Sequence, residues 1–135
     1  MDNLTQDFQN ELLFKEESFR IIGAAMEVSN VLGSGFLEAV YQEALEYELG
    51  DLDIPFEAQK PIQIRYKKRI LKKTYCPDFL CYGKIIVEIK AIKCITEIEE
   101  AQILNYLKAT ELPLGILVNF GTPKIEWRRF ANTMK

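Results

Sequence analysis

The chain has 135 residues, of which 48% are hydrophobic and 27% are charged. A chain of this length buries roughly two-thirds of the surface that its unfolded form exposes, so we expect one domain over residues 1–135. The composition excludes disordered, collagen-like and disulfide-scaffold proteins. No run approaches the roughly 18 apolar residues that span a bilayer, and no basic region precedes an apolar stretch near Met1. We therefore expect a cytoplasmic protein without a membrane partner.

The chain contains three cysteines and no histidine. The absence of histidine excludes Ser-His-Asp triads, Cys-His pairs and histidine metal sites. Three cysteines alone cannot complete a four-ligand zinc site, and an odd number cannot pair fully, so we expect reduced thiols. Any catalysis must therefore use carboxylates, lysine or tyrosine.

Charge is spread unevenly, although the formal net charge is only -3. Residues 1–60 hold 13 acidic and 3 basic groups, a net charge of -10, whereas residues 61–135 hold 7 acidic and 14 basic groups, a net charge of +7. Six cations fall within nine residues of the second half: Arg65, Lys67, Lys68, Arg69, Lys72 and Lys73. This run predicts either a solvated hairpin or an edge that contacts phosphate groups.

Two helices are predicted in the first half of the chain. The first covers residues 14–32 and stops before Gly33. Its inward face is predicted from the helical spacing of Phe19, Ile22, Met26 and Ser29. The second helix follows the glycine-rich break and ends near Gly50. With Gly35 as its N-cap, Glu38 takes the third helical position, where a carboxylate interacts favourably with the helix dipole.

The second half alternates strands with one helix. Strands are predicted over residues 61–66, 70–82 and 84–91, with a basic turn and Gly83 between them. Thr96 and Glu99 have the spacing of a capping box that opens a helix to about residue 110. Strands over residues 114–120 and 124–130 follow. Because a strand reached through a helix can lie parallel to its neighbour, we expect an α/β (α+β) fold with a mixed sheet flanked by helices.

Two carboxylates and a lysine are predicted to share one face of this sheet. If the turn at Gly83 is odd-membered, Asp78 lies opposite Glu88, and the period of two returns Lys90 to the same face. An even-membered turn would place the carboxylates on opposite faces. Two like charges about 5 Å apart are unfavourable unless a cation neutralises them, and Mg²⁺ prefers one or two carboxylates with water and phosphate. The pattern fits a phosphodiesterase centre, and it also fits an ordinary cross-strand salt bridge at the rim of the sheet.

The spacing D-x9-E-x-K, in CPDFLCYGKIIVEIKA, resembles the signature of the PD-(D/E)xK nuclease superfamily. The blocks GFLEAVY, EIK, AQILNYL and LPLGILVNFG occur in this order between about residues 21 and 130. Together they resemble the bacterial GxxExxY protein family, a small branch of that superfamily. The resemblance implies a restriction-endonuclease-like core of helix, three strands, helix and strand.

The resemblance also implies roles for individual residues. Asp78 and Glu88 correspond to the metal ligands, and Lys90 corresponds to the catalytic lysine. Glu38 matches an additional acidic residue that some branches supply to the metal site from the preceding helix. Tyr41, one turn further on, either donates a hydrogen bond into this cluster or packs in the core. The implied activity is phosphodiester hydrolysis with Mg²⁺ or Mn²⁺ as cofactor.

Residues that contact nucleic acid are expected on two segments. Gln102 and Tyr106 share one helical face, and their spacing is similar to the Q-x-x-x-Y motif of the recombination-exonuclease branch, which lies beside the active site. The basic turn adds Arg65, Lys67 and Lys68. The expected partner is DNA or RNA.

Two alternatives to an active nuclease stay open. The same fold without catalysis would be a module that binds nucleic acid or protein through the basic second half. The acidic first half and the basic second half also permit a homo-oligomer with head-to-tail contacts.

Overall fold

The computed structural model describes residues 13–132. In these residues it contains α2 (Lys15–Leu32), α3 (Glu38–Asp51), β1 (Phe56–Ala58), β2 (Ile62–Tyr66), β3 (Arg69–Tyr75), β4 (Phe79–Cys81), β5 (Ile85–Lys90), α4 (Glu97–Thr110), β6 (Leu114–Asn119) and β7 (Glu126–Ala131). None of these helices combines the length and the apolar character that crossing a bilayer requires.

The main sheet has five strands in the order β1-β4-β5-β6-β7. Strands β5 and β6 are parallel and are connected through α4, whereas the other neighbours are antiparallel. The predicted mixed sheet flanked by helices is therefore confirmed. The capping box that opens α4 is also present, because Thr96 and Glu99 satisfy each other's backbone donors.

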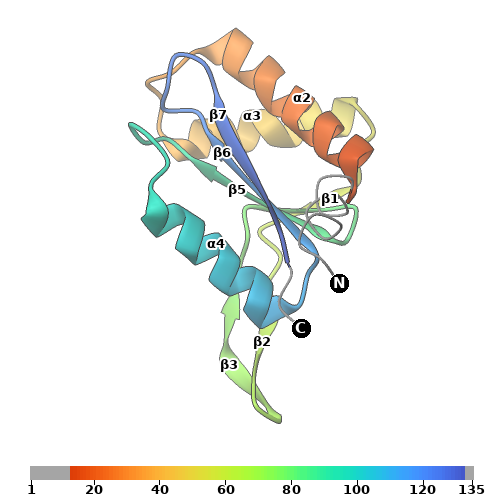
Figure 1. Ribbon diagram of the computed structural model, residues 1–135. Helices are drawn as coiled ribbons and strands as arrows, with labels where there is room; N and C mark the ends of the chain where they lie inside the picture. Colours follow the sequence, from red (N-terminus) through yellow and green to blue (C-terminus); the bar gives the residue numbers. More distant parts are fainter. Residues whose placement is uncertain (1–12, 133–135) are drawn as a thin grey trace, which may run out of the picture.

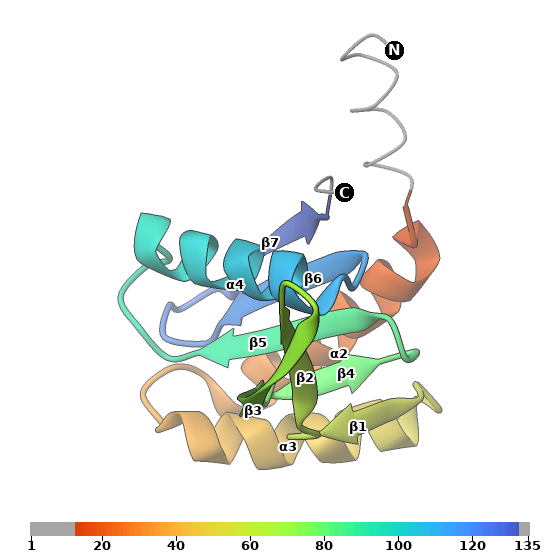
Figure 2. The same cartoon turned by 90° about the horizontal axis from the view of Figure 1, so that it is seen from below.

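Helices cover both faces of the main sheet (Figures 1 and 2). In Figure 2, α4 lies on one side of the sheet, and α2 and α3 lie on the other. The larger core lies under α2 and α3 and includes Ile21, Ala25, Tyr41, Leu45, Phe79, Val87, Ile89, Ile116 and Phe120. Two smaller clusters, around Leu107 and Ile103, pack under α4.

The strand predicted over residues 70–82 is wrong in detail, because the chain forms two strands in different sheets. Strands β2 and β3 pair only with each other, while β4 pairs with β5 and with the short strand β1, which was not predicted. The break falls at Cys76-Pro77-Asp78. Pro77 has no N–H to donate to a ladder, so the chain leaves one sheet here and enters the other.

The predicted inward face of the first helix is also partly wrong. Phe19 is 57% exposed and Met26 is 44% exposed, whereas Ile22 and Ser29 are buried as expected. The remaining buried positions of α2 are Ser18, Ile21, Ala24, Ala25 and Val28. Small side chains let α2 approach the sheet closely, so its buried face follows size as well as hydropathy.

The second helix begins later than expected. Its N-cap is Leu37, and Glu38 occupies the first helical position instead of the third. Gly33 and Gly35 have φ values of 72° and 112°, which place the connection outside helical geometry. Glu38 still lies in the first turn, so its carboxylate remains next to the positive end of the helix dipole.

Candidate active site

The register that joins β4 to β5 brings Asp78 next to Glu88. Phe79 pairs with Val87 and Cys81 pairs with Ile85, so the same register places Asp78 opposite Glu88. The connecting turn has an odd number of residues, and both Tyr82 and Gly83 have positive φ values. The predicted register is therefore confirmed, and the two carboxylates lie where β4 begins and β5 approaches its end.

Backbone groups hold one oxygen of each carboxylate. The amide of Ile89 donates to Asp78 Oδ2 at 2.7 Å, and the amide of Asp78 donates to Glu88 Oε1 at 3.2 Å. Within residues 13–132, no hydrogen bond reaches the other oxygen of either carboxylate. Each carboxylate is thus fixed through one oxygen and keeps the other available to a ligand.

Both carboxylates lie in an environment that disfavours their charge. Burial, followed by the nearby charge of Asp78, raises the pKa of Glu88 to about 7. Burial is also the main reason that the pKa of Asp78 is raised, and the amide of Ile89 opposes this effect. The charge of Glu38 raises the pKa of Asp78 further. A bound cation would remove this penalty, because opposite charge favours the ionised form.

Tyr75 is a site residue that the sequence did not indicate. Its hydroxyl donates to Glu88 Oε1 at 2.6 Å, and its side chain is buried. Burial and the charge of Glu88 raise the pKa of Tyr75, so the hydroxyl keeps its proton and remains a donor. A faint signal exists in the sequence: Tyr75 is an aromatic residue three positions before Asp78, at the end of a basic, polar strand.

Gln102 and Tyr106 contact two residues of this cluster, Lys90 and Tyr75. Lys90 Nζ donates to Gln102 Oε1 at 3.5 Å. The ring of Tyr106 stacks on that of Tyr75, with a centroid distance of 3.6 Å and an interplanar angle of 8°. The structure therefore connects α4 to the carboxylates through two separate side-chain contacts. A direct role of Gln102 or Tyr106 in binding nucleic acid stays a prediction.

Glu38 approaches the site from α3. It lines a cavity of about 490 Å³ together with Asp78 and Ile89. The other lining residues come mainly from the same face of α3 and include Gln42, Glu43 and Glu46. Glu88 and Lys90 are not part of this lining.

Tyr41 packs in the core and does not reach the carboxylates. Its hydroxyl donates to the carbonyl of Gly33 at 2.6 Å, and its ring stacks on Phe120 at 4.6 Å. The packing alternative is therefore correct. Its neighbour Gln42, which the sequence did not single out, donates to the backbone carbonyl of Asp78 at 3.2 Å.

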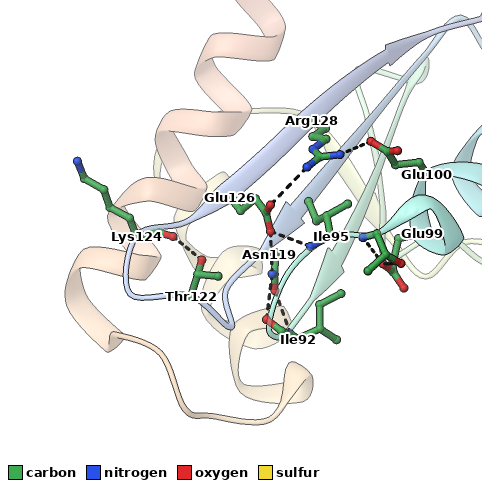
Figure 3. Close-up of polar contacts among 10 residues, drawn as sticks. Ile92, Ile95, Glu99, Glu100, Asn119, Thr122, Lys124, Glu126 and Arg128 are labelled. Atoms are coloured by element: carbon green, nitrogen blue, oxygen red, sulfur yellow. Dashed lines mark hydrogen bonds and ion pairs between the residues drawn. The ribbon is translucent and has the colours of Figure 1, made fainter.

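The buried side-chain amide of Asn119 holds the segment that follows Lys90 (Figure 3). Asn119 donates to the carbonyl of Ile92 and accepts from its amide, both at 3.0 Å. Glu126 accepts from the Asn119 side chain and from the amide of Ile95. In Figure 3, Arg128 lies between Glu126 and Glu100 and forms an ion pair with each. These contacts fix the loop that connects β5 to α4.

No hydrogen bond or ion pair within residues 13–132 joins the predicted basic contacts to the carboxylates. Arg65, Lys67 and Lys68 are exposed near the tip of the β2–β3 hairpin. Arg65 and Lys67 also line a hollow of about 360 Å³ with Asn105 and Lys108 of α4.

The side chains of the site include two oxygen donors that a hard divalent cation prefers. No group of three or more acidic or thiol side chains within residues 13–132 forms a metal cluster. Asp78 and Glu88 supply two carboxylates, and one oxygen of each accepts no hydrogen bond from the described residues. Two carboxylates suit Mg²⁺, which usually keeps several waters and binds substrate phosphate in its remaining positions. The residues therefore fit such an ion, with Asp78 and Glu88 as the pair that the fold brings together.

Comparisons with known proteins agree with this geometry. No curated protein matches the chain significantly. The crystal structure of SSO0001 shares the fold, with a TM-score of 0.56 and 20% sequence identity over 96% of this chain. The chain spans 63% of the length of SSO0001. A family model described as the PD-(D/E)XK nuclease superfamily matches residues 15–130, which is nearly the whole of the described fold. This chain belongs to the PD-(D/E)XK nuclease superfamily.

Proposed function

We propose that this protein is a nuclease that hydrolyses phosphodiester bonds with a divalent cation, Mg²⁺ or Mn²⁺. The observation that carries this proposal is the meeting of Asp78 and Glu88, each fixed through one oxygen by a backbone amide. Superfamily membership supports the same activity, because the spacing to Lys90 matches the superfamily signature.

In this proposal, Asp78 and Glu88 hold the cation, and the carbonyl of Ile89 or the carboxylate of Glu38 assists. A bound cation would polarise the phosphate and lower the pKa of an attacking water. Lys90 is two residues beyond Glu88, so it presents its ammonium group on the same face of β5. Its hydrogen bond to Gln102 limits the directions that the ammonium group can take. Lys90 would orient the attacking water and stabilise negative charge that develops on the phosphate.

We also propose that the chain belongs to the GxxExxY branch. The three residues of that motif have distinct positions in the structure: Gly35 lies in the connection with φ of 112°, Glu38 lines the cavity at Asp78, and Tyr41 ties down the same connection. This division of roles supports the assignment, because the motif then serves to present one carboxylate to the site.

A non-catalytic module that binds nucleic acid is the second candidate function. It is favoured by the exposed cations of the β2–β3 hairpin, and by the lack of a ready three-ligand metal cluster within residues 13–132. Phosphate groups would be the contact in either case. The two functions differ in whether the bound strand is cut.

The test compares the wild type with Asp78→Ala, Lys90→Ala and Glu38→Ala on labelled DNA and RNA, with Mg²⁺ or Mn²⁺. Glu27→Ala removes an exposed carboxylate of α2 and serves as the control. The expected result is loss of cleavage in the Asp78 and Lys90 variants, with an unchanged thermal unfolding midpoint for Lys90→Ala. Cleavage by Asp78→Ala at the wild-type rate would refute the proposal. Salt-sensitive binding without any cleavage by the wild type would favour the binding module.

A further inference from the structure

The β2–β3 hairpin (residues 62–75) is a two-stranded ribbon that forms no ladder with the main sheet. Its base is anchored on α4, where Tyr75 and Ile64 pack with Tyr106 and Leu107. Its outer part projects from the body of the protein (Figure 1). Six of the seven residues of β3 are exposed, and the exception is Tyr75 at the base.

The charged side chains of the ribbon are all basic, and they alternate with the exposed apolar residues Tyr66, Ile70 and Leu71. All six of its cations are exposed, and residues 61–75 contain no acidic side chain. None of the six takes part in an ion pair with another residue of the described chain. Lys67 lies over the ring of Tyr66, at 5.4 Å from its centroid, at the tip. Glu111 lines the hollow beside Arg65 and Lys67 but forms no ion pair with either residue. One carboxylate faces six cations, so most of this charge suits an external polyanion.

The shape of the ribbon restricts which polyanion fits. At a rise of about 3.3 Å per residue, the seven residues of β3 extend roughly 20 Å, and the two strands lie about 5 Å apart. The major groove of B-form DNA is about 12 Å wide and admits a two-stranded ribbon. The major groove of an RNA duplex is deep and narrow, and side chains cannot read it. A single strand has no groove to receive the ribbon.

The base of the ribbon contacts the carboxylates. The hydroxyl of Tyr75 donates a hydrogen bond to Glu88, and Asp78 follows Tyr75 by three residues in the chain. The cavity between Asp78 and α3 is lined by Glu38, Glu43 and Glu46, whose negative charges repel phosphate. A strand held by the ribbon would therefore reach the site from the ribbon side and not along α3.

We infer that the β2–β3 ribbon enters the major groove of double-stranded DNA, and that duplex DNA is the substrate class of this site. The inference rests on the proposed nuclease function for its second half only, because binding by the ribbon requires no chemistry. Binding is independent of sequence, since the exposed cations contact phosphates on both sides of the groove.

The test measures binding by fluorescence anisotropy in EDTA, so that no strand is cut. Wild type, Lys67→Ser/Lys68→Ser and the control Lys84→Ser/Lys124→Ser are titrated with duplex DNA, duplex RNA and single-stranded DNA of equal length. The control removes two cations from loops outside the ribbon. All four substituted side chains lie in turns or loops, and unfolding midpoints check that the variants fold.

Tightest binding of duplex DNA is expected. The ribbon variant should then raise the Kd at low salt roughly tenfold, and lower the slope of log K against log salt by about 1.8. Equal affinity for single strands or for duplex RNA, or equal losses in the ribbon variant and the control, would overturn the inference.

Cleavage of the same substrates with Mg²⁺ is measured separately. Binding of duplex DNA through the ribbon without cleavage supports the role of the ribbon, while it refutes the nuclease and with it the assignment of a substrate. If the wild type cleaves single strands, and the ribbon variant cleaves them at the same rate, the inference is overturned and the nuclease is supported.

Discussion

Replacing Glu88 with glutamine is expected to stabilise the fold above neutral pH. Burial and the charge of Asp78 raise the pKa of Glu88 to about 7 in the folded protein, from its ordinary value of 4.5. Between these two pH values the folded state binds a proton that the unfolded state has lost, so stability falls as pH rises through this window. Each pKa unit corresponds to about 1.4 kcal/mol, so the ionised carboxylate costs about 3 kcal/mol above pH 7. Glutamine stays neutral, and its oxygen can still accept from Tyr75 and from the amide of Asp78.

Urea unfolding of the wild type and Glu88→Gln, at pH 5 and pH 8 in EDTA, measures this difference. The variant should be more stable by up to about 3 kcal/mol at pH 8, and the gain should shrink to less than about 1 kcal/mol at pH 5. Glu27→Gln, at an exposed position of α2, controls for a general effect of removing one negative charge. A gain of equal size at both pH values, or a loss of stability at pH 8, would refute the electrostatic reasoning.

Two further predictions concern contacts that support the site. Tyr75→Phe removes the hydroxyl that donates to Glu88, so it should lower the free energy of unfolding by about 1.5–3 kcal/mol at pH 8. It should also weaken the binding of Mn²⁺ measured by calorimetry. Unchanged Mn²⁺ affinity would show that the hydroxyl does not position Glu88. Gly121→Ala would place a Cβ atom 2.1 Å from the carbonyl oxygen of Ile92, so it should lower the unfolding free energy by more than about 2 kcal/mol. Gly115→Ala is its control, because the new Cβ meets side-chain atoms only, those of Ile103 at 2.8 and 3.0 Å and of Leu107 at 3.3 Å. A larger loss in this control would contradict the assignment of backbone as the more rigid obstacle.

The features that the sequence predicted correctly depend on local periodicity. Two strands and one glycine predict a turn at Gly83, and its odd number of residues, which the sequence left open, determines that Asp78 faces Glu88. The capping box of α4 likewise needs only Thr96 and Glu99. Alternation along β5 then places Lys90, because side chains on a strand repeat every two residues.

The features that could not be predicted depend on contacts between distant segments. Tyr75 gains its role from Glu88, 13 residues away, and from Tyr106 on another element. Strand β1 is only three residues long and exists because β4 offers it an edge. Pro77 did carry a local signal that one strand becomes two, but the alternating residues around it favoured a continuous strand.

The buried side chain of Asn119 acts as a substitute for a strand partner. The last backbone bond alongside β5 is donated by Phe120 to the carbonyl of Lys90, at 2.8 Å. Two residues later, the side-chain amide of Asn119 accepts from the backbone N–H of Ile92 and donates to its carbonyl. The backbone on each side of Lys90 is thus ordered when the protein folds. Conformational entropy that the backbone loses during folding is not lost again when a ligand binds. Ordering the backbone around Lys90 therefore does not weaken the binding of a ligand.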